Sequence, residues 1–200
     1  MNMPRPSSTL VTALVLSLGA AVSLGLSRFS YALLLPPMRS DLQWSYFTAG
    51  LVNAVNAAGY LVGAWWATNC LQRWGARRTL VWAGAASALL LVLHGMTACV
   101  EALALLRATT GVASAMMFVA GGVLAASLST ETPPSQDGET GSATPPVNAG
   151  LVLGLYYGGV GLGILACATV LPRVIDGPDM THAWAGRWGW QRGWWALGGL

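Results

Sequence analysis

The sequence predicts an all-α membrane protein, and three observations support this prediction. Only 10 of the 200 residues are basic and 7 are acidic, whereas a soluble domain of this length would carry about 50 charged residues. Hydrophobic residues make up 54% of the chain, and the mean hydropathy is +0.57. The 25 glycines and 10 tryptophans suit helices that pack closely within a bilayer and meet its surfaces. A soluble globular domain is therefore excluded.

The remaining composition excludes several functions. All ten basic residues are arginines at scattered positions, so we expect no nucleic-acid partner. The three cysteines have no CxxC spacing, which predicts neither a metal site nor another cofactor. No buried carboxylate pair, serine–histidine arrangement or metal cluster is visible, so an enzyme is the least expected class and no catalytic residue is assigned.

Five stretches are long enough to cross a bilayer, which requires about 20 apolar residues. They are residues 10–35, 46–71, 79–98, 102–128 and 147–171. A sixth begins near Trp190, and its residues 190–200 form only a partial span, because the eight residues after Arg192 give about 12 Å of helix. We expect the chain as written to be a fragment, with a truncated sixth helix.

The first stretch has two alternative interpretations. A short basic start before an apolar run is typical of a secretory signal. A membrane span is favoured, because apolar character resumes after Arg28 and four more spans follow. Pro36 and Pro37 are expected to end this helix, since proline has no amide donor, and Asp41 is a candidate N-cap for the next helix.

The second span is followed by Arg73, Arg77 and Arg78, close to three tryptophans. Over the whole chain the basic residues divide equally between the two sides, but the first three connections favour a cytoplasmic N-terminus. We therefore expect a multi-pass protein of the inner cell membrane. Residues 130–146 are rich in proline and acidic residues and are predicted to be a disordered cytoplasmic loop, either a solvated spacer or a regulatory segment.

Two arginines fall within the spans. An ionisable side chain there costs about 3 kcal/mol, so Arg28 and Arg107 are expected to face the interior of the bundle; Arg28 has the alternative of reaching the membrane surface along its long stem. No acidic residue lies within the five spans. The partner of these two positive charges must therefore be the substrate, a residue outside this sequence, or water in a cavity. The first alternative suggests an anionic solute.

The second and fifth spans each carry a distinctive face. Asn53, Asn56 and Tyr60 share one side of the second span, as expected either for the lining of a polar path or for hydrogen bonds between helices. In the fifth span Gly150, Gly154 and Gly158 recur every fourth residue and are followed by Gly159, Gly161 and Gly163, and this glycine face predicts close helix packing or a place to bend. Tyr157 is a further candidate, although it and Tyr156 cannot both face inward.

Three stretches together resemble the N-terminal six-span half of a major facilitator superfamily transporter of the YbfB/YjiJ branch. They are residues 27–38 (SRFSYALLLPPM), 53–63 and 155–161. The loop after the second span resembles the gating motif of that superfamily through Arg73, Gly75, Arg77 and Arg78, with Gln72 in place of its aspartate. Arg107 with Gly111 resembles the fourth-span motif, whose arginine is associated with proton coupling.

The resemblance implies a secondary active transporter that works by alternating access of two six-helix halves. It further implies a small-molecule solute, protons as the coupling ion and a C-terminal half outside this sequence as partner. The candidate cavity residues are Arg28, Asn53, Asn56, Tyr60, Arg107 and Tyr157. The alternative is a truncated, non-transporting membrane remnant or helical scaffold.

Overall fold

The computed structural model describes residues 6–130, 148–175 and 189–199, and these ranges contain helices and no strand. In chain order the elements are α1 (Pro6–Ala20), the π-helix η1 (Ala21–Phe29), α2 (Ser30–Asp41), α3 (Tyr46–Trp74), α4 (Ala76–His94), α5 (Val100–Thr130), α6 (Ala149–Ile175) and α7 (Gly189–Gly199). Apart from Thr130, which ends α5, the loop predicted at residues 130–146 lies outside the described residues. The predicted all-α fold class is confirmed.

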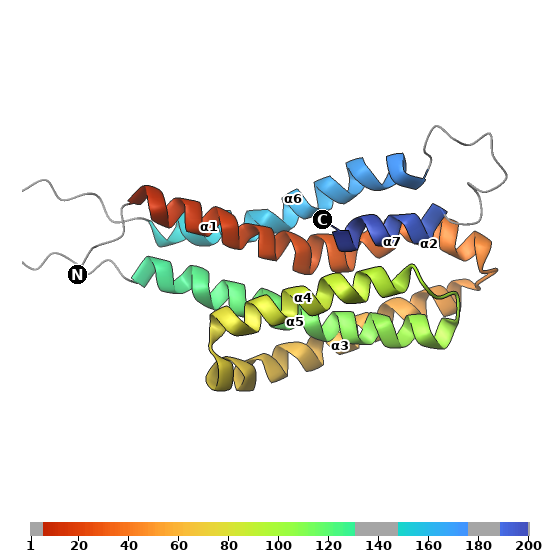
Figure 1. The fold of residues 1–200 in the computed structure, drawn as a ribbon, viewed down its shortest axis with the longest axis horizontal. Coiled ribbons are helices and arrows are strands. Elements are labelled where there is room, and N and C mark those ends of the chain that lie inside the picture. Colours follow the sequence, from red (N-terminus) through yellow and green to blue (C-terminus); the bar gives the residue numbers. More distant parts are fainter. Residues whose placement is uncertain (1–5, 131–147, 176–188, 200) are drawn as a thin grey trace, which may run out of the picture.

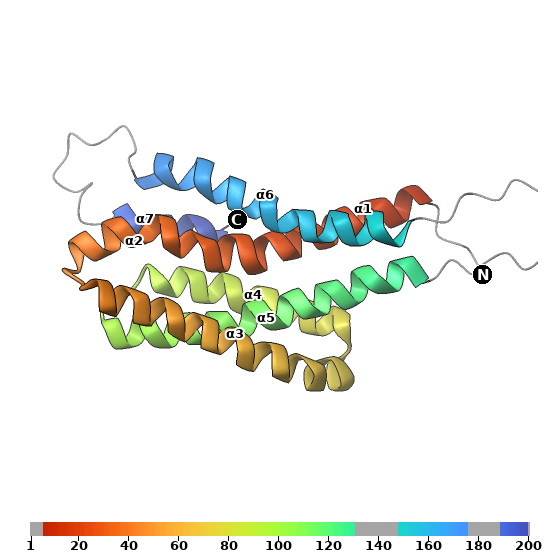
Figure 2. The same ribbon diagram turned by 180° about the vertical axis from the view of Figure 1, so that it is seen from behind.

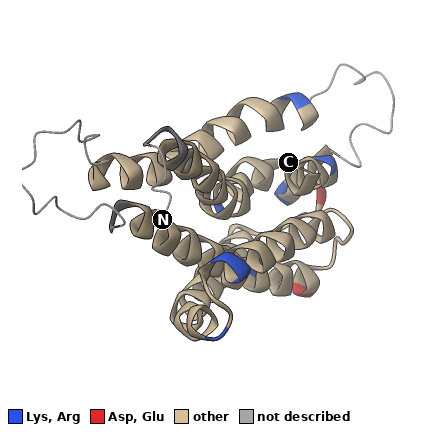
Figure 3. Cartoon of the chain, turned by 60° about the vertical axis from the view of Figure 1, so that its left-hand side comes forward, with Lys and Arg blue, Asp and Glu red and all other residues tan. Residues whose placement is uncertain are grey.

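Five helical segments in the described residues are long and apolar enough to cross a membrane. They are Thr9–Asp41, Tyr46–Trp74, Ala76–His94, Val100–Leu128 and Ala149–Ile175. The first combines α1, η1 and α2 in one continuous span. Charged residues lie mostly near the helix ends, as the coloured segments in Figure 3 show, which is the distribution expected for helices surrounded by lipid.

The spans form a bundle with the first span at its centre. In Figures 1 and 2, α6 crosses the first span: it lies on the outer side of the first span towards the end of the bundle where α2 meets α3 and on the α5 side of α1 at the other end, while α3 lies beyond α5. Helix α6 packs against α1 and η1, while α3 and α4 pack against α5. The short α7 packs against α4, α6 and α2. We call the two ends of the bundle the Gly75 end, where α3 meets α4, and the Asp41 end, where α2 meets α3.

The first helix does not end at Pro36 and Pro37, as the sequence predicted, but continues to Asp41. Proline removes an amide donor but fixes φ near the helical value, so a helix supported by its neighbours can continue through it. That support is packing, because Leu34 and Met38, on either side of the prolines, are buried in the core. The helix is completed by the Leu42 N–H, which donates to the Met38 carbonyl.

The N-cap of α3 is Ser45 and not the predicted Asp41. The Ser45 hydroxyl oxygen accepts a hydrogen bond from the Thr48 N–H at 3.1 Å, which satisfies one of the free donors of the first turn. Asp41 instead ends α2, where its carboxylate accepts a 2.8 Å hydrogen bond from Trp190 Nε1 at the start of α7.

A single residue, Gly75, connects α3 to α4. Its φ of +80° lies in a region that glycine occupies without the strain other residues suffer. The Gly75 N–H donates to the Leu71 carbonyl at 3.0 Å, and the Thr79 hydroxyl donates to the Gly75 carbonyl at 2.9 Å. The tight turn lets Arg77 and Arg78 enter the first turn of α4.

Among the described residues, the close packing of α6 falls on Gly159 and Gly163 of the glycine-rich stretch. Gly150, Gly154 and Gly158 are exposed, and none has a neighbouring helix within reach among the described residues. A Cβ on Gly159 would instead collide with the Ser17 carbonyl, and one on Gly163 would collide with the backbone of Ala21. Gly159 and Gly163 are also four residues apart, so one face of α6 makes the close contacts with α1 and η1.

Candidate functional site

Arg107 lies at the centre of the candidate site. Its side chain extends from α5 and is 0% exposed. The guanidinium donates from Nη1 to the Ser27 carbonyl of η1 at 2.9 Å and from Nη2 to Asn53 Oδ1 of α3 at 3.5 Å. Its Cζ lies 4.5 Å from the centre of the Tyr31 ring of α2, a cation–π distance. One arginine therefore joins three of the spans.

The backbone around Arg107 is held by a close approach of α3 and α5. Asn56 is buried, and its Nδ2 donates to the Arg107 carbonyl at 2.8 Å. A Cβ on Gly59 would collide with the Ala108 carbonyl, and one on Gly111 would collide with the Asn56 carbonyl. Small residues are what allow helix backbones to come this close within a membrane.

The Arg107 guanidinium has no carboxylate partner among the described residues. The two acidic residues there are Asp41 and Glu101, and both are exposed near the Asp41 end. The partners of Arg107 are a carbonyl, an amide and aromatic faces, and its Nε has no hydrogen-bond partner. A positive charge is thus held in the bundle by neutral groups, which leaves it able to attract an anion.

Arg28 lies in a second group of side chains. It is half-buried on η1, and its Cζ lies 5.3 Å from the centre of the Tyr60 ring of α3. Tyr157 of α6 lies near enough to Tyr60 for an electrostatic interaction. Of the sequence-predicted residues, Arg28 and Tyr60 are therefore in contact, with Tyr157 within electrostatic range of Tyr60, while Arg107, Asn53 and Asn56 form the first group.

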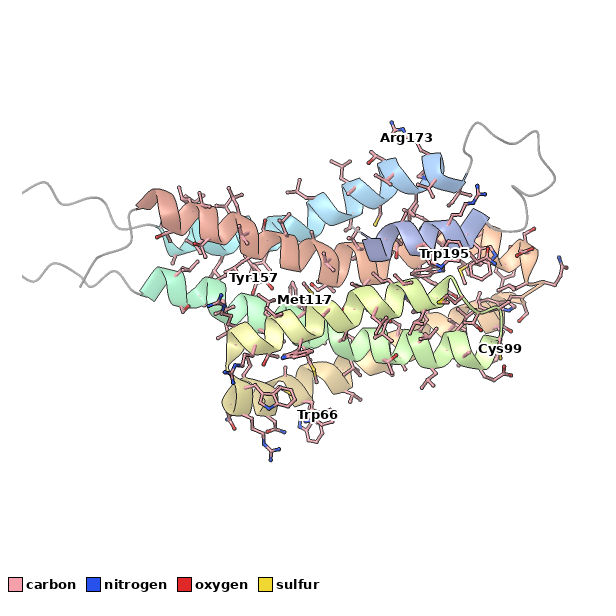
Figure 4. The ribbon with its side chains drawn as sticks, in the orientation of Figure 1. Trp66, Cys99, Met117, Tyr157, Arg173 and Trp195 are labelled. Carbon is pink, nitrogen blue, oxygen red and sulfur yellow. The ribbon has the colours of Figure 1, made fainter. Side chains whose placement is uncertain are left out.

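The paired tyrosines of α6 divide between core and surface. Tyr156 is 0% exposed, whereas Tyr157 is 51% exposed and points away from the ribbon of α6 in Figure 4. The Tyr156 hydroxyl donates to the Phe118 carbonyl at 2.6 Å. The two tyrosine rings still meet edge to face, with centres 5.2 Å apart. The buried Tyr156 therefore packs against Tyr157 and helps to hold its ring in place.

Three residues of the Arg107 group were not among the predicted site residues. Ser27 contributes only a backbone carbonyl, which no side-chain pattern reveals. Tyr31 lies three residues after Arg28 on the same helical stripe, and that spacing was the available signal. Trp194 of α7 lies 6.0 Å from the Arg107 Cζ by its ring centre, and the sequence pattern offers no sign of this contact.

The gating-loop residues Arg73, Gly75, Arg77 and Arg78 are all exposed at the Gly75 end. Arg73 borders an open hollow of about 370 Å³ together with Trp66, which Figure 4 labels, and Trp74. The loop lies well along the bundle from Arg107, which is close to the start of α5. Among the described residues, the loop and the Arg107 group are separate features.

Apolar spans that pack around a buried arginine define an α-helical, multi-pass membrane protein with a charged centre. Comparison with known families identifies the kind of protein. The family described as "Uncharacterised MFS-type transporter YbfB" matches residues 20–200, and the chain belongs to this family of major facilitator transporters. The match confirms the resemblance found in the sequence and identifies a transporter family, not an enzyme family. No curated protein matches the chain.

Proposed function

We propose that the protein is a secondary active transporter that moves a small organic anion by alternating access. The observation that carries this proposal is the complete burial of Arg107 without a carboxylate among the described residues. A buried charge is costly unless it is paired. A carboxylate or similar group on the solute would provide the missing charge.

The second group of side chains supports the nature of the solute. Arg28 lies over Tyr60, and the half-exposed Tyr157 is nearby. A positive charge beside aromatic faces suits a solute that has an apolar body next to an anionic group. We therefore propose that Arg28, Tyr60 and Tyr157 bind the body of the solute, while the buried Arg107 and Asn56, together with the exposed Asn53, form the charged part of the site.

Alternating access requires two halves that move against each other around a central site. We propose that a C-terminal half completes the transporter and that protons are the coupling ion. We also propose that the Gly75 end faces the cytoplasm of a cell with the protein in its inner membrane, since Arg73, Arg77 and Arg78 lie there and positive residues favour that side.

The test is uptake by the full-length protein in liposomes. Radiolabelled benzoate and succinate serve as anionic probes, and tetraethylammonium serves as the cationic probe. We expect uptake of at least one anion, with large losses in Arg28→Ala and Arg107→Gln. Arg173→Ala is the matched control, because Arg173 is exposed on α6 and donates to the Thr169 carbonyl of its own helix.

Two outcomes would overturn the proposal. Uptake of the cation alone, with Arg28→Ala as active as the parent, would exclude an anionic solute. The absence of any transport by well-folded protein across a broad panel of solutes would favour the helical scaffold.

A further inference from the structure

The buried side-chain atoms that lack a hydrogen-bond partner gather on three helices. Among the described residues they are Ser87 Oγ and His94 Nε2 on α4, Arg107 Nε on α5, and Gln191 Oε1 and Trp194 Nε1 on α7. Buried polar atoms in proteins are nearly always paired, either with protein or with bound water. Five unpaired atoms on adjacent helices therefore indicate a place where water belongs. We call this region the α4–α5–α7 wedge.

The polar residues of the wedge face each other. Ser87 and His94 are seven residues apart on one face of α4, and Gln191 and Trp194 are three apart on one face of α7. The two faces meet directly, because the rings of His94 and Trp194 stack with their centres 4.6 Å apart.

The two helices run in opposite directions and lie close together. Gly95, just after α4, lies against the Gln191 carbonyl near the start of α7, and Gly198 near the end of α7 lies against Val92. The seam between them therefore starts at the Asp41 end and runs inward along α4. His94, the last residue of α4, lies near the beginning of this seam.

The hydrogen bond of His94 fixes which ring nitrogen is free. Nδ1 lies 2.6 Å from the Leu90 carbonyl, and because a carbonyl only accepts, Nδ1 carries the hydrogen. In the neutral ring Nε2 then carries a lone pair, and no donor among the described residues reaches it. His94 is 0% exposed, so this basic nitrogen is held inside the bundle with its accepting position open.

We infer that Nε2 of His94 is a proton-binding site that water reaches along the α4–α5–α7 wedge from the Asp41 end. A hydronium ion gives its proton to the Nε2 lone pair and leaves as water, while the Nδ1–H bond to the Leu90 carbonyl stays in place. The N–H bond is the only bond formed, and returning the proton to water reverses the step.

The charged group that faces His94 is Arg107 of α5. On α7 the facing groups, Gln191 and Trp194, are uncharged, and Arg28 of η1 lies over Tyr60. The Trp194 ring is 4.6 Å from His94 and 6.0 Å from the Arg107 Cζ. A proton on His94 therefore places a second positive charge on one side of the Trp194 ring, which already has Arg107 as a neighbour.

Repulsion between these two charges loosens Arg107 from the neutral groups that hold it, and this links proton binding to the anion site. The inference rests on the proposed function for this last step, where it names His94 as the residue that binds the coupling proton. The protonation itself is independent of any solute.

The test uses the two histidines of the chain. Replacing His182 and every histidine outside these 200 residues with Asn leaves His94 as the single histidine of the full-length protein, labelled with ¹⁵N in bilayers of phosphatidylethanolamine and phosphatidylglycerol. Solid-state NMR then reads the state of both ring nitrogens and the transfer of magnetisation from water, between about pH 9 and about pH 3, because burial and the charge of Arg107 both oppose a positive ring at this position. We expect Nδ1–H with water contact at Nε2 at high pH and protonation of Nε2 as the pH falls. An Nε2–H form at high pH, a dry Nε2 or an unchanging ring would each overturn the inference.

Matched variants test the wedge as the route. Trp194→Phe keeps an aromatic ring but removes the Nε1–H, and we expect it to lose most of the water signal at Nε2. Trp82→Phe makes the same change at a 70% exposed tryptophan of α4 and is expected to leave the signal unchanged. Gln191→Met gives a second wedge variant if Trp194→Phe does not fold. A full water signal in a folded wedge variant would overturn the route, whereas a failure of anion uptake alone would overturn only the proposed function.

Discussion

At the scale of single residues, the candidate site depends on the shape of one guanidinium as much as on its charge. Arg107 donates to Ser27 and Asn53 from separate nitrogens and lies over the Tyr31 ring. The planar guanidinium makes these contacts at once, whereas a lysine ammonium is a compact, strongly hydrated point charge. The contacts of Arg107 are therefore not reproduced by another positive residue.

We predict that Arg107→Lys abolishes most uptake of the anionic probe although the net charge is unchanged. The ammonium would lose the contacts that position the charge, and burying it costs more because it is hydrated more strongly. Initial uptake rates in liposomes measure the effect, with Arg173→Lys as the control. If Arg107→Lys retained the parental rate, charge alone would be sufficient at this position.

The two asparagines of the site are predicted to differ in their effect on stability. The buried Asn56 makes a 2.8 Å hydrogen bond to the Arg107 carbonyl, whereas Asn53 is exposed and lies 3.5 Å from Arg107. Asn56→Ala should lower the free energy of unfolding by about 1 kcal/mol, within the range of hydrogen bonds between membrane helices. Asn53→Ala should lower it much less. Unfolding in detergent compares the two variants, and equal losses would contradict this assignment.

The sequence predicts part of this site for a clear physical reason. A charge inside a span is costly, so the interior position of Arg107 follows from the sequence alone. The partners of Arg107 do not follow, because Ser27 lies 80 positions away in the chain and helical periodicity specifies a face without naming the helix that covers it. The contact with Trp194 is hidden for the same reason.

At the scale of helices, α6 shows how far a glycine pattern can be interpreted. Both Gly154 with Gly158 and Gly159 with Gly163 have the spacing of four residues. The spacing predicts a flat face, but it does not decide between two faces separated by about 100° of rotation. The second pair packs against α1 and η1.

The N-cap of α3 is likewise not determined by residue type alone. Both Ser45 and Asp41 are of a type that can cap a helix, and the position at which α3 starts decides between them.

Adjacent glycines of α6 allow a direct test of this packing. A Cβ on Gly159 would meet the backbone and side chain of Ser17, whereas one on Gly158 meets nothing among the described residues. We predict that Gly159→Ala lowers the free energy of unfolding by about 2 kcal/mol, as expected for overpacking. Gly158→Ala should leave it unchanged or slightly raised, since alanine favours the helix. Equal stability of both variants would show that α6 does not contact α1 through Gly159.

At the scale of the whole molecule, the fold class is the most predictable feature, because the proportions of apolar and charged residues depend on whether lipid or water surrounds the protein. A chain with so few charges cannot cover a soluble core, and its long apolar stretches can satisfy their backbone groups in lipid as helices. The orientation in the membrane is a finer question, which depends on a few arginines. In the bundle Arg73, Arg77 and Arg78 lie at the Gly75 end, and the exposed Cys99 lies towards the Asp41 end, as Figure 4 shows.

The cysteines provide a test of orientation that requires little engineering. Cys99 is exposed between α4 and α5, whereas Cys70 and Cys167 are buried. A cytoplasmic Gly75 end predicts that a membrane-impermeant maleimide labels Cys99 in intact, outer-membrane-stripped cells, without permeabilising the inner membrane. In Cys99→Ser combined with Arg77→Cys, the reactive thiol moves to the Gly75 end, and labelling should then require permeabilised or inverted membranes. The opposite pattern would place the gating loop outside the cell, where the positive-inside rule disfavours its three arginines.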